Sequence, residues 1–221
     1  VADWDTVEWE LRESYDLYKR LSDYRQLAEN LGTTGQMLTA RGRFLQVYDL
    51  GEELRELGSR LDDAQAELWG WLYQGTSLLR RGDAREAMVC LRNGERLLHA
   101  GVGGANVGWL HGLMAETYTR LNDPVRARAA AASAAESLYG ERPTVVFALD
   151  GFTGVAETTF VHWRTGRSRG DAGASAERAV KKLTAYSRVF PIGQPAAHRY
   201  RGPLKPPGGD DIKRLPHVMI C

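Results

Sequence analysis

The chain has 221 residues, 43% of them hydrophobic, so it is long and apolar enough to fold as one sizeable domain or a short repeat array. Its 29 basic and 28 acidic side chains leave a net charge of +1, which attracts neither nucleic acid nor an anionic membrane. No stretch approaches the roughly 20 apolar residues that span a bilayer, and the acidic start VADWDTVEWE is the reverse of a signal peptide. We therefore expect a cytoplasmic protein whose partners include no nucleic acid and no membrane.

The first predicted element is a helix at the N-terminus. Its apolar residues follow one another three or four positions apart, as on one face of a helix: Val7, Leu11, Tyr15, Tyr18, Leu21, Tyr24, Ala28 and Leu31. We assign residues 1–24 to a capping helix, because a repeat array needs a terminal element that shields its hydrophobic end from water.

A repeat with a period of forty residues follows. Turn residues recur at Gly42, Gly82 and Asn122. Residues of the same kind keep a constant distance from these turns: Gly35, Gly75 and Ala115 before them, then Leu38, Leu78 and Tyr118, with Val47, Ala87 and Ala127 after them. Small residues at intervals suit antiparallel helices that approach closely, and glycine or asparagine suits the left-handed end of a helix. Asp83 and Asp123 then fall at N-cap positions.

The repeat places helical hairpins at residues 25–59, 64–99 and 105–140, with a looser fourth pair at 144–167 and 172–190. The repeat array therefore covers residues 25–190. Six of the eight prolines come later, so we expect a largely irregular tail at residues 191–221. The predicted fold class is all-α, a right-handed α-solenoid of antiparallel helical hairpins.

The segment WGWLYQGTSLLRRGDAREAMVCL resembles the tetratricopeptide motif, with Trp71, Gly75, Leu78, Gly82, Ala87 and Leu91 at its large, small and turn positions. The next segment, HGLMAETYTRLNDPVRARAAAASA, keeps the small residues but has His111 where the motif has tryptophan. The period of forty departs from the usual thirty-four and is similar to the longer repeats of LuxR-like transcriptional activators with ATPase modules. Residues 151–202 resemble the C-terminal helical region of multidomain bacterial adenylate or guanylate cyclase-type proteins. This resemblance implies a sensory or scaffolding segment, because the chain has no GxxxxGK[ST] loop and no cyclase domain.

In tetratricopeptide-like arrays the first helix of each hairpin lines a concave groove. The corresponding positions predict a peptide-binding groove made of Trp69, Thr76, Arg80, Trp109, Glu116, Arg120, Phe160 and Arg164. Arginines flanked by aromatic residues would suit a carboxylate-bearing peptide, since guanidinium groups bind carboxylates with two hydrogen bonds. The alternative is that the tryptophans pack between helices and the arginines only occupy helix C-termini, where a cation is favourable.

The sequence shows no signature of catalysis or of a cofactor. No serine, histidine and acid form a known nucleophilic pattern. Cys90 and Cys221 are far apart, so we expect no thiolate metal site, and Cys90 reads as a small buried residue. His111 and Glu116 are five residues apart and do not share a helix face, which argues against zinc. The basic residues of the tail are interrupted by two aspartates, so we interpret them as a solvated segment rather than a phosphate site.

These observations predict a protein that is not an enzyme, has no cofactor or metal, and binds a protein or peptide as a scaffold or regulatory module. Self-association through apolar surface at the C-terminal end of the array is also expected. The alternative is a detached C-terminal fragment of a nucleotide cyclase or of an ATP-dependent transcriptional regulator, with no activity of its own.

Overall fold

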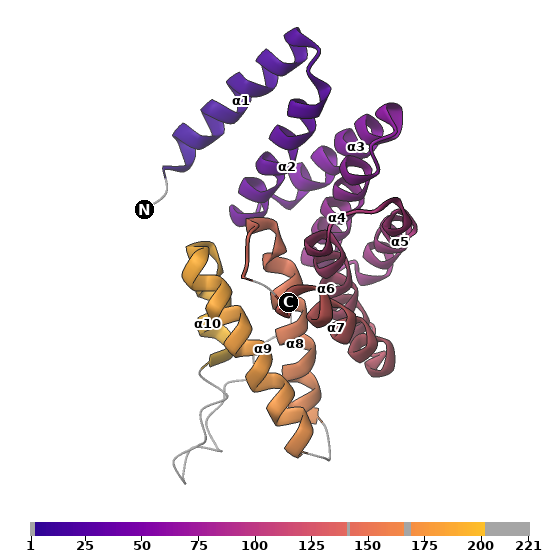
Figure 1. Ribbon diagram of the computed structural model, residues 1–221, viewed down its shortest axis with the longest axis vertical. Coiled ribbons are helices and arrows are strands. Elements are labelled where there is room, and N and C mark those ends of the chain that lie inside the picture. Colours follow the sequence, from indigo (N-terminus) through magenta and orange to yellow (C-terminus); the bar gives the residue numbers. More distant parts are fainter. Residues whose placement is uncertain (1–2, 141, 166–168, 202–221) are drawn as a thin grey trace.

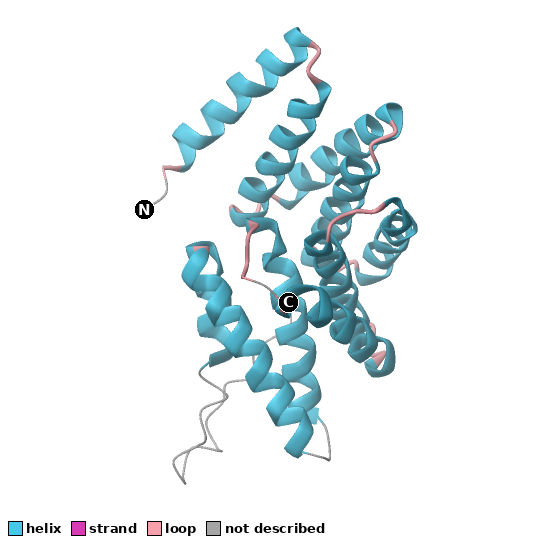
Figure 2. Ribbon diagram, viewed as in Figure 1, coloured by secondary structure: helices cyan, strands magenta, loops and turns pink. Residues whose placement is uncertain are grey.

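The computed structural model describes residues 3–140, 142–165 and 169–201, and these residues fold into helices joined by short turns (Figure 1). No strand occurs in the described part of the chain (Figure 2), so the all-α prediction is confirmed. The α-helices are α1 (Trp4–Leu21), α2 (Tyr24–Ala40), α3 (Phe44–Leu61), α4 (Ala64–Arg80), α5 (Ala84–Glu95), α6 (Gly104–Arg120), α7 (Pro124–Tyr139), α8 (Leu149–Thr165), α9 (Arg169–Val189) and α10 (Gln194–Arg201). Short 3-10 turns lie at Arg96–Ala100, Val146–Ala148 and Pro191–Gly193.

The turn residues expected from the sequence lie directly after helices. Gly42, Gly82 and Asn122 follow α2, α4 and α6, and their φ angles are +71°, +97° and +57°. Asp123 caps α7, since its carboxylate accepts a 3.1 Å hydrogen bond from the Arg126 amide. Asp83 occupies the matching position before α5, but its side chain accepts no capping hydrogen bond.

Two segments differ from the expected hairpins. The chain after α7 stays extended at Val145 and passes through a 3-10 turn, so α8 begins at Leu149 instead of residue 144. The expected irregular tail is helical over residues 191–201. Pro191 and Pro195 lie in the first turns of these short helices, where no amide donor is needed. The remaining tail, residues 202–221, lies outside the described residues.

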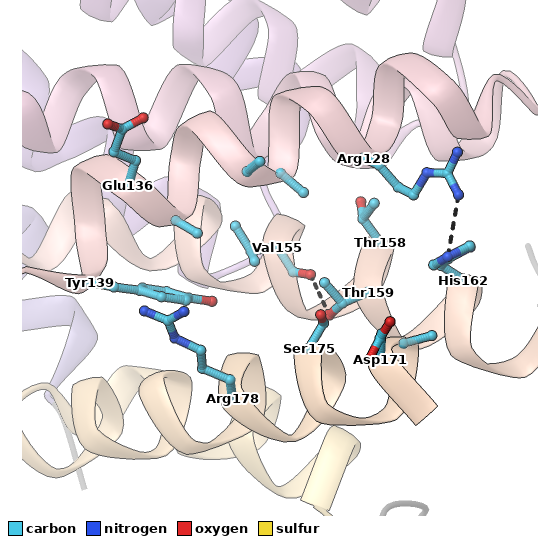
Figure 3. Close-up of a pocket in the computed structure, with 14 residues that line it drawn as sticks. Arg128, Glu136, Tyr139, Val155, Thr158, Thr159, His162, Asp171, Ser175 and Arg178 are labelled. Atoms are coloured by element: carbon cyan, nitrogen blue, oxygen red, sulfur yellow. Dashed lines mark hydrogen bonds between the residues drawn. The ribbon is translucent and has the colours of Figure 1, made fainter. Parts of the chain in front are cut away.

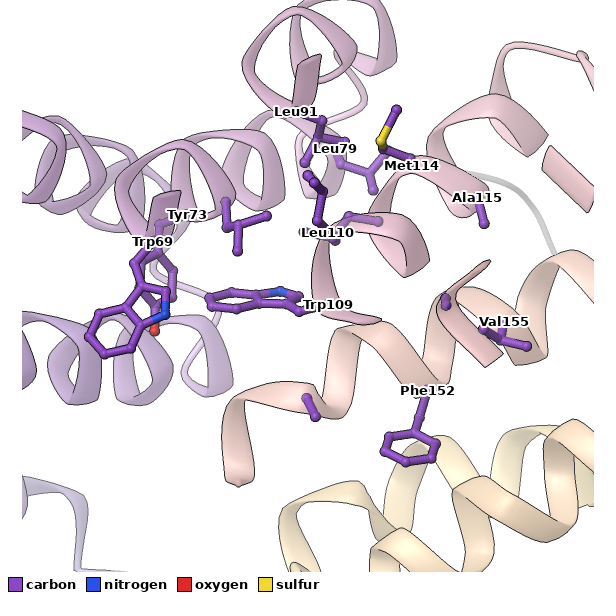
Figure 4. Close-up of a cluster of buried hydrophobic side chains, with 14 of the residues drawn as sticks. Trp69, Tyr73, Leu79, Leu91, Trp109, Leu110, Met114, Ala115, Phe152 and Val155 are labelled. Carbon is purple, nitrogen blue, oxygen red and sulfur yellow. The ribbon is translucent and has the colours of Figure 1, made fainter. Parts of the chain in front are cut away.

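The core is continuous along the helices and holds large aromatic and aliphatic side chains (Figure 4). Glycines allow some of the helices to approach closely. A Cβ atom on Gly112 of α6 would lie 2.4 Å from the Cα of Gly151 of α8, and one on Gly70 of α4 would lie 2.5 Å from the Gly51 carbonyl oxygen of α3. Side chains at these positions would force the paired helices apart.

The three small residues expected to be equivalent all lie in packed positions, but their neighbours differ. A Cβ atom on Gly35 would meet the Tyr73 ring of α4 at 2.6 Å. One on Gly75 would meet Leu91 of α5 at 2.9 Å, and Ala115 is fully buried. A small residue is therefore required at Gly35 and at Gly75 for different reasons, because a different side chain packs against each of them.

Helix α1 lies along the start of the fold and has no buried residue. Partly buried residues such as Val7 and Leu11 pack against the core, and polar contacts add to this packing. Glu8 pairs with Arg41 and Arg43, and Asn30 donates a 3.1 Å hydrogen bond to the Leu11 carbonyl oxygen. The side chain of Leu21 is 65% exposed, so the apolar face predicted for this helix is only partly covered. Among the described helices, none has the length and hydropathy that crossing a bilayer requires.

Candidate functional site

A pocket of about 380 Å³ brings the two ends of the described chain together. We call it the aromatic pocket and define it by Trp4, Tyr73, Trp109, Phe147, Pro191 and Ile192, with Gln36, Thr39 and Asp150 as its polar groups. Trp4 comes from α1, whereas Pro191 and Ile192 come from the turn after α9, and Figure 1 shows the start of α1 on the same side of the molecule as α10. The pocket therefore depends on segments nearly two hundred residues apart.

The aromatic rings of this pocket contact one another. The centre of the Trp109 ring system lies 5.2 Å from the centre of the Tyr73 ring, and the two rings are nearly perpendicular. The Phe147 ring centre lies 5.5 Å from that of Trp109. Trp69 lies behind them, 6.0 Å from Phe147. One edge-to-face pair and two tilted pairs of rings thus form an apolar wall, and such aromatic contacts stabilise it beyond the burial of their area. The wall combines two helices, α4 and α6, with a 3-10 turn, because Phe147 belongs to the segment that precedes α8.

Two of these rings have a hydrogen-bond partner for their polar group, and one does not. Tyr73 donates a 2.6 Å hydrogen bond to the Gly32 carbonyl oxygen, and Trp69 donates a 2.8 Å hydrogen bond to Asn106. Trp109 is only 2% exposed, yet its indole N–H has no acceptor among the described residues. A buried donor without an acceptor is costly, and Trp109 has the one unsatisfied indole N–H among the buried rings of this wall.

An ion network lies next to the pocket and connects α4, α6 and α8. Arg80 donates hydrogen bonds to Glu116 at 2.5 Å and to Asp150 at 2.8 Å. Arg120 donates to the same Glu116 oxygen at 2.8 Å. Burial alone would raise the pKa of Glu116, but the attraction of both guanidinium groups outweighs it, so this pKa is held below its usual range.

The eight predicted groove residues have different surroundings in the structure. Trp69, Thr76, Trp109 and Glu116 are buried. The structure brings Glu116 together with Arg80 and Arg120, so these charges bind each other. Phe160 does not line the aromatic pocket, and its ring centre lies 5.9 Å from the ring centre of Tyr200 in α10. The guanidinium carbon of Arg164 lies 5.8 Å from the centre of the Phe160 ring. Of the eight residues, Trp109 alone lines the aromatic pocket.

Several residues of the aromatic pocket were not singled out from the sequence. Tyr73 had a usable signal, since it lies four residues after Trp69 and so shares its helix face. Phe147 and Ile192 had none, because both lie in 3-10 turns without helical periodicity.

The residues considered for metal or thiol chemistry have ordinary surroundings. No group of three or more histidine, cysteine, aspartate or glutamate residues suited to a metal occurs in the described ranges. Cys90 is buried, and burial raises the pKa of its thiol to about 11, which keeps the sulfur protonated at neutral pH. Burial also lowers the pKa of His111. Cys221 lies outside the described residues.

The comparisons with known proteins concern the fold. No family model matches the chain, and no curated protein matches it in sequence. The crystal structure of BtubC (BKLC) from P. vanneervenii is similar, with a TM-score of 0.62, 14% sequence identity, and coverage of 93% of this chain and 91% of that chain. The all-helical fold of this chain is thus similar to that of BtubC over nearly the whole length of both.

Proposed function

We propose that this chain is a non-catalytic scaffold or regulatory module that holds a peptide segment of another protein, and that the segment binds in the aromatic pocket. The observation that carries the proposal is the buried Trp109 N–H without an acceptor, set in a wall of aromatic rings. A peptide offers both complements, since its backbone carbonyl accepts from the indole and an apolar side chain fills the pocket.

We further infer that the helices form a tetratricopeptide-like, right-handed solenoid with units of about forty residues. Helices α2, α4 and α6 support this inference, because each spans 17 residues and they begin at residues 24, 64 and 104. The turns after them are also forty residues apart. In a solenoid these three helices would line one face, and all three contribute residues to the aromatic pocket.

The charges near the pocket bear on the peptide's chemistry. A carboxylate-bearing peptide was expected to bind Arg80 and Arg120, but both are held by Glu116, and Arg80 also by Asp150. An acidic peptide would have to displace these carboxylates. We therefore propose that apolar or aromatic side chains of the peptide supply most of the binding free energy. A peptide carboxylate near Arg80 contributes less.

A peptide-display experiment tests the proposal. Random twelve-residue peptides are selected on the unmodified chain, and the enriched peptides are then measured against Ile192→Arg and Val89→Arg. Both positions are exposed, at 37% and 55%, but only Ile192 lines the aromatic pocket. We expect binding to weaken at least tenfold for Ile192→Arg and to stay within twofold for Val89→Arg. Peptides that bind both variants equally well, or a selection that enriches none, would contradict the proposal.

Self-association through the C-terminal end remains a prediction. Helix α10 covers part of this end, since Ala197 and Tyr200 are buried against the helices before it. Val189 is still 50% exposed there. Analytical ultracentrifugation of the full chain over a hundredfold concentration range would detect a dimer.

A further inference from the structure

A second pocket, of about 540 Å³, opens between α7 and α9, with α8 as its floor (Figure 3). We call it the alanine groove and define it by Ala131, Ala132 and Ala135 of α7, Val155 and Thr159 of α8, and Ala172 of α9. Helices α7 and α9 both pack against α8. The short side chains on the two walls leave space between these helices that larger side chains would fill. The volume is within the range of pockets that bind small molecules.

One end of the alanine groove is formed by Tyr139. Its side chain is only 9% exposed, yet its hydroxyl has no hydrogen-bond partner among the described residues. In Figure 3 the hydroxyl end of the ring points along the groove, towards Val155 and Ser175. A buried hydroxyl without a partner costs free energy, and an acceptor on a ligand would remove this cost.

Positive charge surrounds the same end. The guanidinium of Arg178 lies 5.5 Å from the centre of the Tyr139 ring, and the Lys182 ammonium lies at the same distance and donates to the Tyr139 carbonyl oxygen. Neither cation forms an ion pair within the described part of the chain. Glu136 is nearby, but its carboxylate points away from the Tyr139 ring and from Arg178 (Figure 3). This end of the groove therefore favours an anion.

The opposite end has balanced charges. Arg128 lies 3.3 Å from the imidazole Nε2 of His162, and Asp171 lines the groove below them. Between the two ends, the alanines of α7 and Val155 of α8 provide an apolar surface. Ala132 is seven residues before Tyr139, which corresponds to about 10 Å along the helix axis.

We propose that the alanine groove binds a small organic acid that has a carboxylate on an apolar chain. The carboxylate accepts hydrogen bonds from the Tyr139 hydroxyl and from Arg178, whose planar guanidinium suits two carboxylate oxygens. The apolar chain lies along Ala135, Ala132 and Ala131. This site is separate from the aromatic pocket, so the proposal does not rest on peptide binding there.

Calorimetric titration of the full chain with decanoate tests the proposal. We expect saturable binding at one site per chain. Tyr139→Phe should weaken it at least fivefold and Arg178→Gln at least tenfold, and Ala135→Leu should abolish it by filling the groove. Arg92→Gln, which removes an exposed arginine from α5, is the matched control and should change nothing.

Three further measurements make the result decisive. Tyr139→Phe removes a hydroxyl that has no partner, so its melting temperature should equal or exceed that of the unmodified chain, and weaker binding is then not a folding defect. Decanol, which lacks the carboxylate, should bind at least tenfold more weakly than decanoate. Ile192→Arg should bind decanoate normally, which separates this test from that of the aromatic pocket. Absence of saturable binding, equal affinity for decanol, or unchanged affinity in Arg178→Gln and Tyr139→Phe overturns the proposal.

Discussion

Arg80 and Asp150 are seventy residues apart in the sequence, and the guanidinium of Arg80 donates a 2.8 Å hydrogen bond to the Asp150 carboxylate. Since Arg80 also donates to Glu116, one side chain of α4 binds both α6 and α8. Glu116 is the most buried member of the network, with a side chain 6% exposed. The network therefore connects three helices through charges that have lost most of their contact with water.

Removal of Glu116 should destabilise the fold strongly. Glu116→Ala leaves Arg80 with Asp150 alone and leaves the partly exposed Arg120 without a carboxylate, and we expect this loss to cost about 1–3 kcal/mol. Urea unfolding followed by circular dichroism measures the loss. Glu56→Ala, an exposed glutamate of α3, is the control and should change stability by less than about 0.5 kcal/mol. A similar loss in both variants would show that the network contributes little.

The same carboxylate should make stability fall in acid. Its pKa in the folded chain is below the ordinary value of 4.5, so the unfolded chain binds the proton more readily. The stabilisation is therefore complete above about pH 4.5 and is lost as the pH falls through the lowered pKa of the folded state. Unfolding free energies measured from pH 7 to pH 3 should decline less steeply for Glu116→Gln than for the unmodified chain. Parallel declines would contradict the assignment.

The contact between α6 and α8 should not tolerate a methyl group at Gly112. Its Cβ atom would lie 2.4 Å from the Gly151 Cα, which is backbone and cannot rotate away. We expect Gly112→Ala to lower the free energy of unfolding by about 1–3 kcal/mol. Gly140→Ala is the control, because nothing lies within 4 Å of its Cβ position and its φ is −70°. A melting temperature for Gly112→Ala equal to that of the control would refute the close contact.

The turn after α4 should require glycine for its backbone conformation alone. Gly82 has φ of +97° and open space around its Cβ position, so Gly82→Ala creates strain without a clash. A cost of about 1–2 kcal/mol is expected. Gly103→Ala, at a φ of −61° and also in open space, should have no such cost. Asn122→Gly should be neutral or stabilising, because it relieves the same strain at a φ of +57°. Thermal denaturation of the three variants measures these differences.

The sequence by itself determined the helices and turns from α1 to α7, because their signals are local, whereas it did not predict α10 or the start of α8. Apolar spacing of three and four residues predicts helices, and glycine or asparagine after a helix predicts the left-handed ends observed at Gly42, Gly82 and Asn122. Trp69 and Trp109 were predicted to line a groove, with packing between helices as the alternative, and both side chains are buried. Their role in peptide binding remains a proposal.

Only the tertiary structure decided where the two pockets and the ion network lie and which residues form them. The aromatic pocket requires Phe147 and Ile192, from two 3-10 turns, to meet helices that lie far away in the sequence. The partners of Arg80 depend on the distance between α6 and α8, which Gly112 and Gly151 set. The alanine groove depends on how α7 and α9 rest on α8. A helix is specified by residues within a turn or two of one another, whereas a pocket is specified by the packing of several helices, which no local pattern encodes.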